Sequence, residues 1–193
     1  LDLTGHGQSD WRSADASYQI WDDLPEVLGV VDALGWDSFN LIGHSRGAII
    51  STLLASSFPE RVEKLIMLDA LSPGPVVAEQ FPQQLRKALI EKPALLGRDN
   101  RVFSSVEAAI DSRCRTGLSR AAAEMLVKRS VRGCQQGLTW TTDPRLHGAS
   151  AVKLTDGQIR AVLLGLEMPT LLMAAQTNAR RMPDMVQQAK EYI

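Results

Sequence analysis

The chain has 193 residues and a formal net charge of −1, with 45% apolar and 22% charged residues. This length suits one substantial hydrophobic core, and the near-neutral, scattered charge gives no electrostatic footprint for nucleic acid or an anionic membrane. No apolar run approaches the ~20 residues that are needed to cross a bilayer.

The cysteines and the two ends of the chain give further expectations. Cys114 and Cys134 are too few for a disulfide framework, so we interpret them as free thiols of a cytoplasmic protein. The N-terminus has no basic and apolar signal segment. The chain opens like the end of a buried strand (residues 1–3) and closes like the middle of a helix. We therefore expect a fragment of a larger protein.

The first long periodic segment predicts a helix. Residues 18–34 carry apolar side chains at helical spacing, and Gly35 lies where such a helix would end. Asp15 or Ser17 could cap its start. Pro25 falls inside the segment, so we expect a kink or a late start there.

The next segments alternate between strand and helix. Residues 39–42 form a short apolar run, residues 46–57 predict a helix that Pro59 ends, and residues 62–71 predict a strand that is apolar on both faces. A strand of that kind is typical of a parallel sheet covered by helices. The repetition indicates an α/β fold with a mostly parallel, doubly wound sheet.

The pattern changes after residue 75. Only helices are expected between residues 79 and 130, and Ser105 and Ser119 could cap two of them. A loop-rich return precedes a helix capped by Thr155. We expect an α/β core in residues 1–75 and 154–193, and a helical cap in residues 76–153. The individual segments expected are helices at 80–90, 105–114, 119–130, 155–164 and 184–193, and a strand at 169–175.

The motif GHSRG is a G-x-S-x-G sequence between an apolar strand and an apolar helix. This context predicts a strained turn that exposes the hydroxyl of Ser45 above the sheet as a nucleophile. Gly43 and Gly47 would let the helix pack close to the strand. The N–H of Arg46 would point at the developing oxyanion, and His44 would point away from the hydroxyl as a structural residue.

The chain resembles the α/β-hydrolase superfamily over nearly its whole length, in the segments LDLTGHGQSD, DALGWDSFNLIGHSRGA, FPERVEKLIMLDAL and PTLLMAAQ. Two further segments, IWDDLPEVLGVVDALGW and LTWTTDPRL, more narrowly resemble serine hydrolase-like proteins. The resemblance implies that the first strands and the second oxyanion donor precede residue 1. It also implies a cap from residue 80 to about residue 153, and a triad in the order Ser, acid, His.

The acid of that triad has more than one candidate. Asp69 follows a strand next to the nucleophile strand, and neighbouring strands lie ~5 Å apart, so its carboxylate could reach a histidine near Ser45. The alternative for Asp69 is a cap or turn residue. Asn178 stands where the superfamily commonly carries the acid, and an amide cannot stabilise an imidazolium as a carboxylate does. Asp184 is expected to be a first-turn helix acid.

The base is not evident among the three histidines. His6 matches a loop residue that shapes the substrate pocket in the superfamily, or it is a hydrogen-bonded turn residue. His147 could serve only if the cap folded it over Ser45. The superfamily's base follows a last strand that this chain does not reach. Because a serine without a base is a poor nucleophile, we expect these 193 residues alone to have little activity.

Together these features predict hydrolysis of a carboxylic ester or thioester through an acyl-serine intermediate. The expected partner is a small-molecule substrate, with no cofactor, metal, nucleic acid or membrane. Trp140 is expected to contact the substrate, whereas Trp21 and Trp36 are expected in the core. The alternatives are a catalytically impaired protein that binds a small ligand, and a carbon–carbon bond hydrolase. Serine at the turn argues against dehalogenase and epoxide hydrolase chemistry, which uses Asp there.

Overall fold

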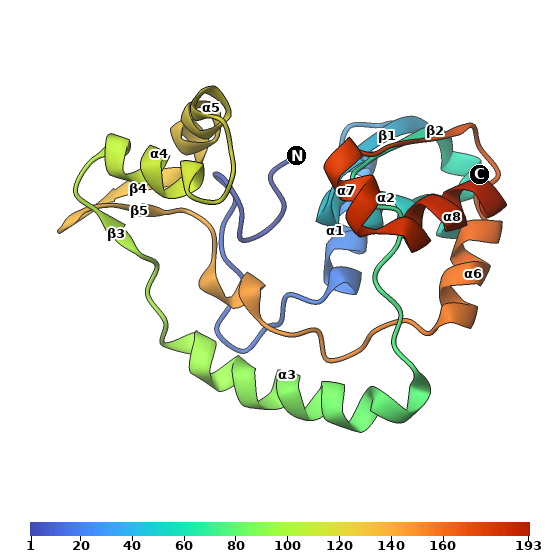
Figure 1. The fold of residues 1–193 in the computed structure, drawn as a ribbon, viewed down its shortest axis with the longest axis horizontal. Helices are drawn as coiled ribbons and strands as arrows, with labels where there is room; N and C mark the ends of the chain where they lie inside the picture. The colour runs from blue at the N-terminus through green and yellow to red at the C-terminus, as the bar shows by residue number, and fades with distance from the viewer. The chain divides into compact units, whose positions relative to one another are not determined.

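The computed structural model describes residues 1–193, which divide into two compact units (Figure 1). The sheet unit consists of Gln19–Arg86 and Ser150–Ile193. The mixed unit consists of Leu1–Tyr18 and Lys87–Ala149. The mixed unit therefore holds most of the residues predicted as a cap, together with the first residues of the chain.

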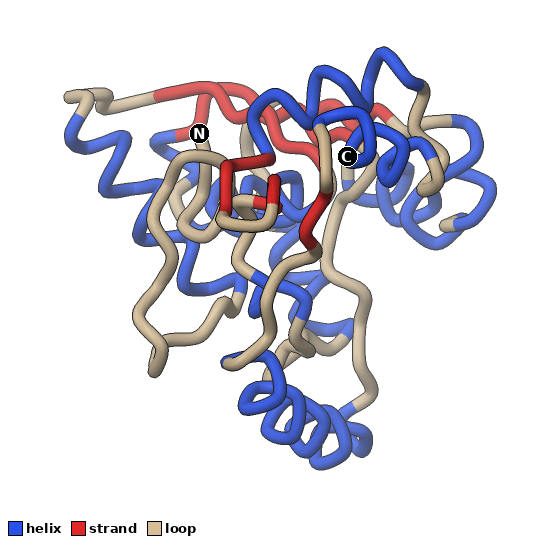
Figure 2. Tube along the Cα trace, turned by 90° about the vertical axis from the view of Figure 1, so that its left-hand side faces the viewer, coloured by secondary structure: helices blue, strands red, loops and turns tan.

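The sheet unit contains a parallel sheet of three strands in the order β1-β2-β6. The strands are β1 (Phe39–His44), β2 (Val62–Leu68) and β6 (Thr170–Met173), and they run side by side (Figure 2). His44 pairs with Leu68, and Leu68 pairs with Met173. The carboxyl ends of all three strands therefore meet at one edge, as the predicted parallel α/β sheet requires.

Helices cover one face of this sheet. The helix α2 (Arg46–Ser57) contacts β1 and β2 and also α1 (Ile20–Ala33) and α6 (Asp156–Leu164). Leu54 of α2, Leu65 and Met67 of β2, and Leu163 of α6 are fully or almost fully buried in one apolar cluster. Burial of such side chains stabilises a fold by roughly 1.5–3 kcal/mol each. The unit is completed by α7 (Gln176–Arg181) and α8 (Pro183–Tyr192).

The opposite face of the sheet exposes apolar side chains. Ile42 pairs in register with Ile66, and Ile66 pairs with Leu171, so these three project from the same face. Ile42 is 67% exposed and Leu171 is 51% exposed. The two faces of the sheet thus differ sharply in how well helices cover them.

The mixed unit joins two helices to a small antiparallel sheet. α4 (Val106–Cys114) contacts α5 (Arg120–Ser130), and α3 (Phe81–Leu96) carries the chain from the sheet unit into this unit. The strands have the order β3-β5-β4. Their bounds are Val102–Phe103 for β3, Val131–Cys134 for β4 and Gly137–Trp140 for β5.

This small sheet corrects the expectation of helices alone followed by a loop. β4 and β5 form a hairpin in which Cys134 pairs with Gly137, so the turn consists of Gln135 and Gln136. Two glutamines lack the Asn-Gly or Asp-Gly signal that identifies such a turn in a sequence. Residues 1–3 also differ from the expectation, because they form no strand.

Most predicted helix boundaries are confirmed. Ser105 and Ser119 cap α4 and α5, and Thr155 forms a capping box with Gln158. Gly35 has a φ of 69° directly after the end of α1. The expected caps of α1 were wrong. Its N-cap is Gln19, whose N–H donates to Asp22 Oδ2 over 2.9 Å, and the helix runs on through Pro25. The extension of α3 to Leu96 and the helix α7 were not predicted.

Candidate active site

The turn between β1 and α2 holds Ser45 in a strained conformation. Ser45 has φ 51° and ψ −117°, a region that residues other than glycine rarely occupy. Its N–H donates to the carbonyl of Leu68 over 2.9 Å, and its own carbonyl accepts the N–H of Ala48 over 3.0 Å. The residue is exposed and its hydroxyl makes no capping hydrogen bond. This is the backbone geometry that the motif predicted.

The two glycines of the motif have different roles. A Cβ added to Gly43 would lie 2.3 Å from the carbonyl oxygen of Gly47, a distance that no side chain tolerates. A Cβ added to Gly47 would have nothing within 4 Å. The close approach of strand and helix therefore depends on Gly43, and the expected packing role of Gly47 was wrong, because its Cβ position is open.

His44 and Arg46 flank the serine. His44 is exposed and projects from the same sheet face as Ile42, as expected for a residue that points away from the serine hydroxyl. Arg46 begins α2, so the peptide after Ser45 lies at the positive end of the helix dipole. The Arg46 side chain was expected to reach the cap or the solvent. Instead, its Nη2 lies 2.7 Å from Oδ2 of Asp23, a residue of α1 that is only 1% exposed.

Asp69 makes the contacts of a turn residue. Its φ is 59°, and its N–H donates to the carbonyl of Met173 over 2.9 Å. Its Oδ1 accepts the N–H of Ala175 over 2.6 Å, and its carbonyl accepts the Asn178 side-chain amide over 2.9 Å. These bonds match the alternative interpretation of Asp69 as a residue that joins a strand to a helix start. Its role as triad acid stays a prediction.

The histidines are divided between the units. His44 belongs to the sheet unit, whereas His6 and His147 belong to the mixed unit. The backbone of His6 is bonded within a turn, with its N–H donating to Leu3 over 2.9 Å, and its Nδ1 is buried without a partner. His147 is exposed at the end of a short 3-10 helix. A substrate-shaping role of His6 stays a prediction.

Trp140 packs inside the mixed unit. Its ring lies 4.9 Å from the ring of Phe103 in an edge-to-face arrangement, and the Arg113 guanidinium lies 4.3 Å from the Trp140 centroid. Its contact with substrate stays a prediction. Trp36 was expected in the core, but it is 52% exposed. It follows Gly35, beyond the last turn of α1, where the helical period no longer applies.

A buried polar cluster in the mixed unit was not predicted. The Tyr18 hydroxyl donates to Oδ2 of Asp143 over 2.7 Å, and Arg145 Nη2 donates to the same oxygen over 2.7 Å. Burial raises the pKa of Tyr18 to about 12, with further help from the bond to Asp143. Burial opposes ionisation of Asp143, but the bonds from Arg145 and Tyr18 hold its pKa below the usual value. The local signal was the Asp-Pro-Arg sequence, in which Asp143 caps a short helix.

Three remaining features of the chain concern metal ligands, cysteine thiols and apolar helices. No three His, Cys, Asp or Glu side chains gather closely enough to hold a metal ion. Cys114 and Cys134 are free thiols, as predicted. None of the helices combines the length and the apolar character that a membrane span needs.

Comparison with known proteins gives evidence on the family that is independent of the geometry of this turn. A family model described as alpha/beta hydrolase fold matches residues 1–108. The chain belongs to the α/β hydrolase fold family. Among solved structures, a hypothetical protein of Pseudomonas aeruginosa PAO1 has a TM-score of 0.96 and 38% identity, covering 100% of this chain and 69% of that one.

Two further relatives carry functional names. A serine hydrolase-like protein of Dictyostelium discoideum is 28% identical over 94% of this chain and 52% of its own length. The thioesterase domain from the curacin biosynthetic pathway has a TM-score of 0.79 and 27% identity, covering 98% of this α/β hydrolase chain and 69% of that domain. The chain spans 52% and 56% of the first two curated relatives, or about half their length.

Proposed function

We propose that this α/β hydrolase is a serine hydrolase that cleaves a carboxylic ester or thioester through an acyl-serine intermediate at Ser45. The observation that carries the proposal is the strained backbone of Ser45, with φ 51°, which holds an exposed hydroxyl at the carboxyl edge of a parallel sheet. Strain of this kind persists where function requires it. The names of the serine hydrolase-like and thioesterase relatives add support.

In the proposed reaction, the Ser45 oxygen attacks the carbonyl carbon of the substrate while a histidine takes the hydroxyl proton. The oxyanion forms at the N-terminus of α2, where Arg46 is the first helical residue. The alcohol or thiol leaves with the proton, and water then releases the acid from Ser45. His44 lies on the exposed face of β1, so we assign the base not to His44 but to the histidine that follows the last strand in the superfamily.

Asp69 is the proposed partner of that histidine, and residues 76–153 are the proposed cap over the site. The serine chemistry needs no metal or cofactor, and free thiols suit a protein of the cytoplasm. The partner expected from this chemistry is a small-molecule substrate. Products distinguish an esterase from a carbon–carbon bond hydrolase, because only the esterase releases an alcohol or thiol.

One observation favours a second candidate, an impaired hydrolase that binds a small ligand. The Asp69 carboxylate accepts a hydrogen bond from the Ala175 N–H, and the Asn178 side-chain amide donates to the Asp69 carbonyl. Both residues near the expected acid position are thus engaged in structure. A hydrolase with no available acid would bind its ligand without turnover.

A serine-reactive fluorophosphonate probe separates the two candidates. The full gene product is expected to be labelled at Ser45, and Ser45→Ala is expected to lose the label. Ser57→Ala is the matched control, because Ser57 lies on the same helix and donates to Leu53 over 2.8 Å, away from the turn. Labelling that survives Ser45→Ala would reject Ser45 as the nucleophile, and absence of labelling in the full gene product would reject the enzyme and favour the binder.

A further inference from the structure

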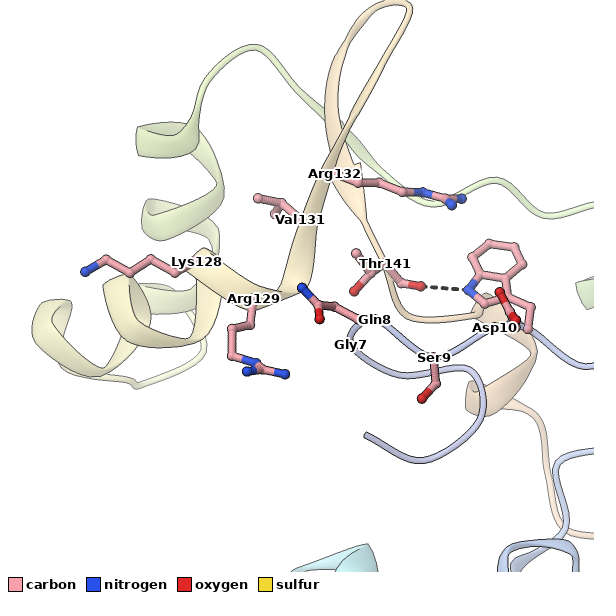
Figure 3. Close-up of a pocket in the computed structure, with 10 residues that line it drawn as sticks. Gly7, Gln8, Ser9, Asp10, Lys128, Arg129, Val131, Arg132 and Thr141 are labelled. Carbon is pink, nitrogen blue, oxygen red and sulfur yellow. Dashed lines mark hydrogen bonds between the residues drawn. The ribbon is translucent and has the colours of Figure 1, made fainter. Parts of the chain in front are cut away.

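The mixed unit contains a cavity that the serine chemistry does not use. Its volume is about 590 Å³, and it lies between residues 7–11 and the junction of α5 with β4 (Figure 3). Pockets for small molecules commonly have volumes of roughly 300–1,000 Å³. The cavity is therefore large enough for a small organic ligand.

The charged residues around this cavity are mostly cationic. Lys128, Arg129 and Arg132 line it, against a single carboxylate from Asp10. Arg129 is paired with Asp2, whose Oδ2 lies 2.9 Å from Arg129 Nη2. Lys128 and Arg132 form no ion pair with a carboxylate within the described residues, so an excess of positive charge remains at the cavity.

Arg132 is held in place for binding. Its guanidinium lies 5.2 Å from the centroid of the Trp11 ring, a cation–π contact. The Trp11 indole is in turn fixed, because its Nε1 donates to the Thr141 carbonyl over 2.7 Å. Figure 3 shows the Arg132 side chain extending toward the side of the cavity where Asp10 lies, whereas the Lys128 side chain extends away from Gln8 and Asp10. Arg132 is thus the cation best placed for a ligand, and its planar fork suits a phosphate.

A second cavity adjoins the first. Its volume is about 400 Å³, it also includes Trp11 and Arg132, and Trp140 lies on its wall. Arg98 and Asp99 also line this cavity, so its two indole rings provide an apolar surface beside two guanidinium groups and one carboxylate. That combination suits a phosphate attached to a flat organic body better than it suits free phosphate.

We propose that these two cavities form a binding site for a small phosphorylated organic molecule, with Arg132 as the main contact of the phosphate. The site goes beyond the proposed hydrolysis, since it lies within the mixed unit and uses neither Ser45 nor Asp69. Its ligand is a phosphorylated molecule that binds separately from the substrate of Ser45.

Calorimetric titration of the full gene product tests this site with three probes: adenosine monophosphate, adenosine and inorganic phosphate. Adenosine monophosphate is expected to bind at least about tenfold more tightly than adenosine, the loss expected when a charged hydrogen bond is removed. Its affinity should also fall as salt rises, because exposed cations are screened. Equal affinity for adenosine monophosphate and adenosine would overturn the phosphate contact. Equal affinity for adenosine monophosphate and phosphate would overturn the organic part.

The decisive variant is Arg132→Gln, with Arg101→Gln as its matched control. Arg101 also stacks on an aromatic ring, 5.2 Å from Phe103, but it lines neither cavity. Arg132→Gln is expected to weaken binding of adenosine monophosphate by about tenfold to a hundredfold, and Arg101→Gln to change it less than about twofold. Arg132→Lys should bind with intermediate affinity, which excludes simple unfolding. Equal loss in both glutamine variants would overturn the site.

Labelling of Arg132→Gln by the fluorophosphonate probe is expected to match that of the unmodified protein. The phosphate site and the serine chemistry can therefore fail separately. A protein that loses phosphate binding but keeps its label supports both proposals. A protein that binds adenosine monophosphate through Arg132 but never labels supports this site alone.

Discussion

Ser45 and Asp69 have positive φ angles of 51° and 59°, and they follow the register pair His44–Leu68 at the ends of neighbouring strands. Each donates its N–H to the next strand, Ser45 to Leu68 and Asp69 to Met173, both over 2.9 Å. The same positive φ and the same hydrogen bond to the next strand thus occur at the ends of two neighbouring strands. It ends each strand abruptly and brings both side chains to the same edge of the sheet.

The strain at Ser45 predicts that a residue without this strain would stabilise the fold while removing the reactive hydroxyl. Ser45→Gly is expected to raise the free energy of unfolding by about 1 kcal/mol, because glycine adopts this φ without a steric penalty but loses more chain entropy. The probe should no longer label the protein. Urea unfolding of both forms measures the effect, and a lower stability of Ser45→Gly would show that the turn is not strained.

The close approach at Gly43 predicts opposite results for two alanine variants. Gly43→Ala places a Cβ 2.3 Å from the Gly47 carbonyl oxygen, so we expect a loss of more than about 2 kcal/mol or a failure to fold. Gly47→Ala has an open Cβ position in a helix, and a neutral effect or a gain of up to about 1 kcal/mol is expected. Thermal unfolding compares the two. Equal midpoints would contradict this packing of strand and helix.

The pair between Asp23 and Arg46 predicts that α1 stabilises the turn. Asp23→Asn removes the charged partner of Arg46, whose side chain is 34% exposed, so we expect a cost of about 1–3 kcal/mol. Arg46→Met should cost a similar amount, and the double variant less than the sum of the two. A double-mutant cycle by urea unfolding measures this coupling, and additive losses would mean that the two residues act independently.

The buried cluster of Tyr18, Asp143 and Arg145 predicts a stability that depends on pH at both extremes. The folded pKa of Tyr18 is raised to about 12, so its contribution is present below its unfolded pKa near 10 and is lost as pH rises toward 12. The folded pKa of Asp143 is lowered, so its contribution is present above its unfolded pKa and is lost as pH falls through the folded value.

Tyr18→Phe isolates the alkaline part. It should cost about 1–2 kcal/mol at pH 7, since the hydroxyl bonds both Asp143 and the Arg12 N–H. Between pH 10 and pH 12 the difference between the two proteins should shrink, because the unfolded tyrosine ionises first. Urea unfolding across this range measures it. A difference that stays constant would exclude Tyr18 as the source of the alkaline loss.

The exposed face of the sheet predicts self-association of the isolated chain. Ile42 and Met173 are 67% and 55% exposed, whereas Leu65 and Met67 on the other face of the sheet are fully buried. Exposed apolar surface of this kind favours aggregation. Ile42→Lys should reduce binding of an apolar dye and raise solubility without changing the fold. Leu65→Lys is the control on the buried face, and it should unfold the protein. Similar behaviour of both variants would contradict the assignment of the faces.

The sequence predicted the fold best where local patterns carry the information. The run before Ser45, the glycines around it and the apolar helix after it lie together in the chain, so the turn could be predicted from their order. The hairpin of β4 and β5 could not, because Gln135 and Gln136 carry no turn signal. The contact of Tyr18 with Asp143 joins residues 125 positions apart, and no local pattern reports such a pair.

Asp69 illustrates a different limit. Its place after an apolar strand fits a catalytic acid and a turn residue equally well, because both need a polar side chain at the end of a strand. Only the contacts with Ala175 and Asn178 show that the turn function is fulfilled. Reactivity at this residue depends on a partner that the sequence pattern does not identify.

The bond from Asn178 to the Asp69 carbonyl also restricts how this site can evolve. A single replacement of Asn178 by aspartate would restore an acid at the position common in the superfamily. An ionised aspartate cannot donate a hydrogen bond, so the carboxylate would face the Asp69 carbonyl and lie near a second carboxylate. The single replacement that would restore a conventional triad therefore gives a destabilised protein, and a compensating change near Asp69 would have to come first.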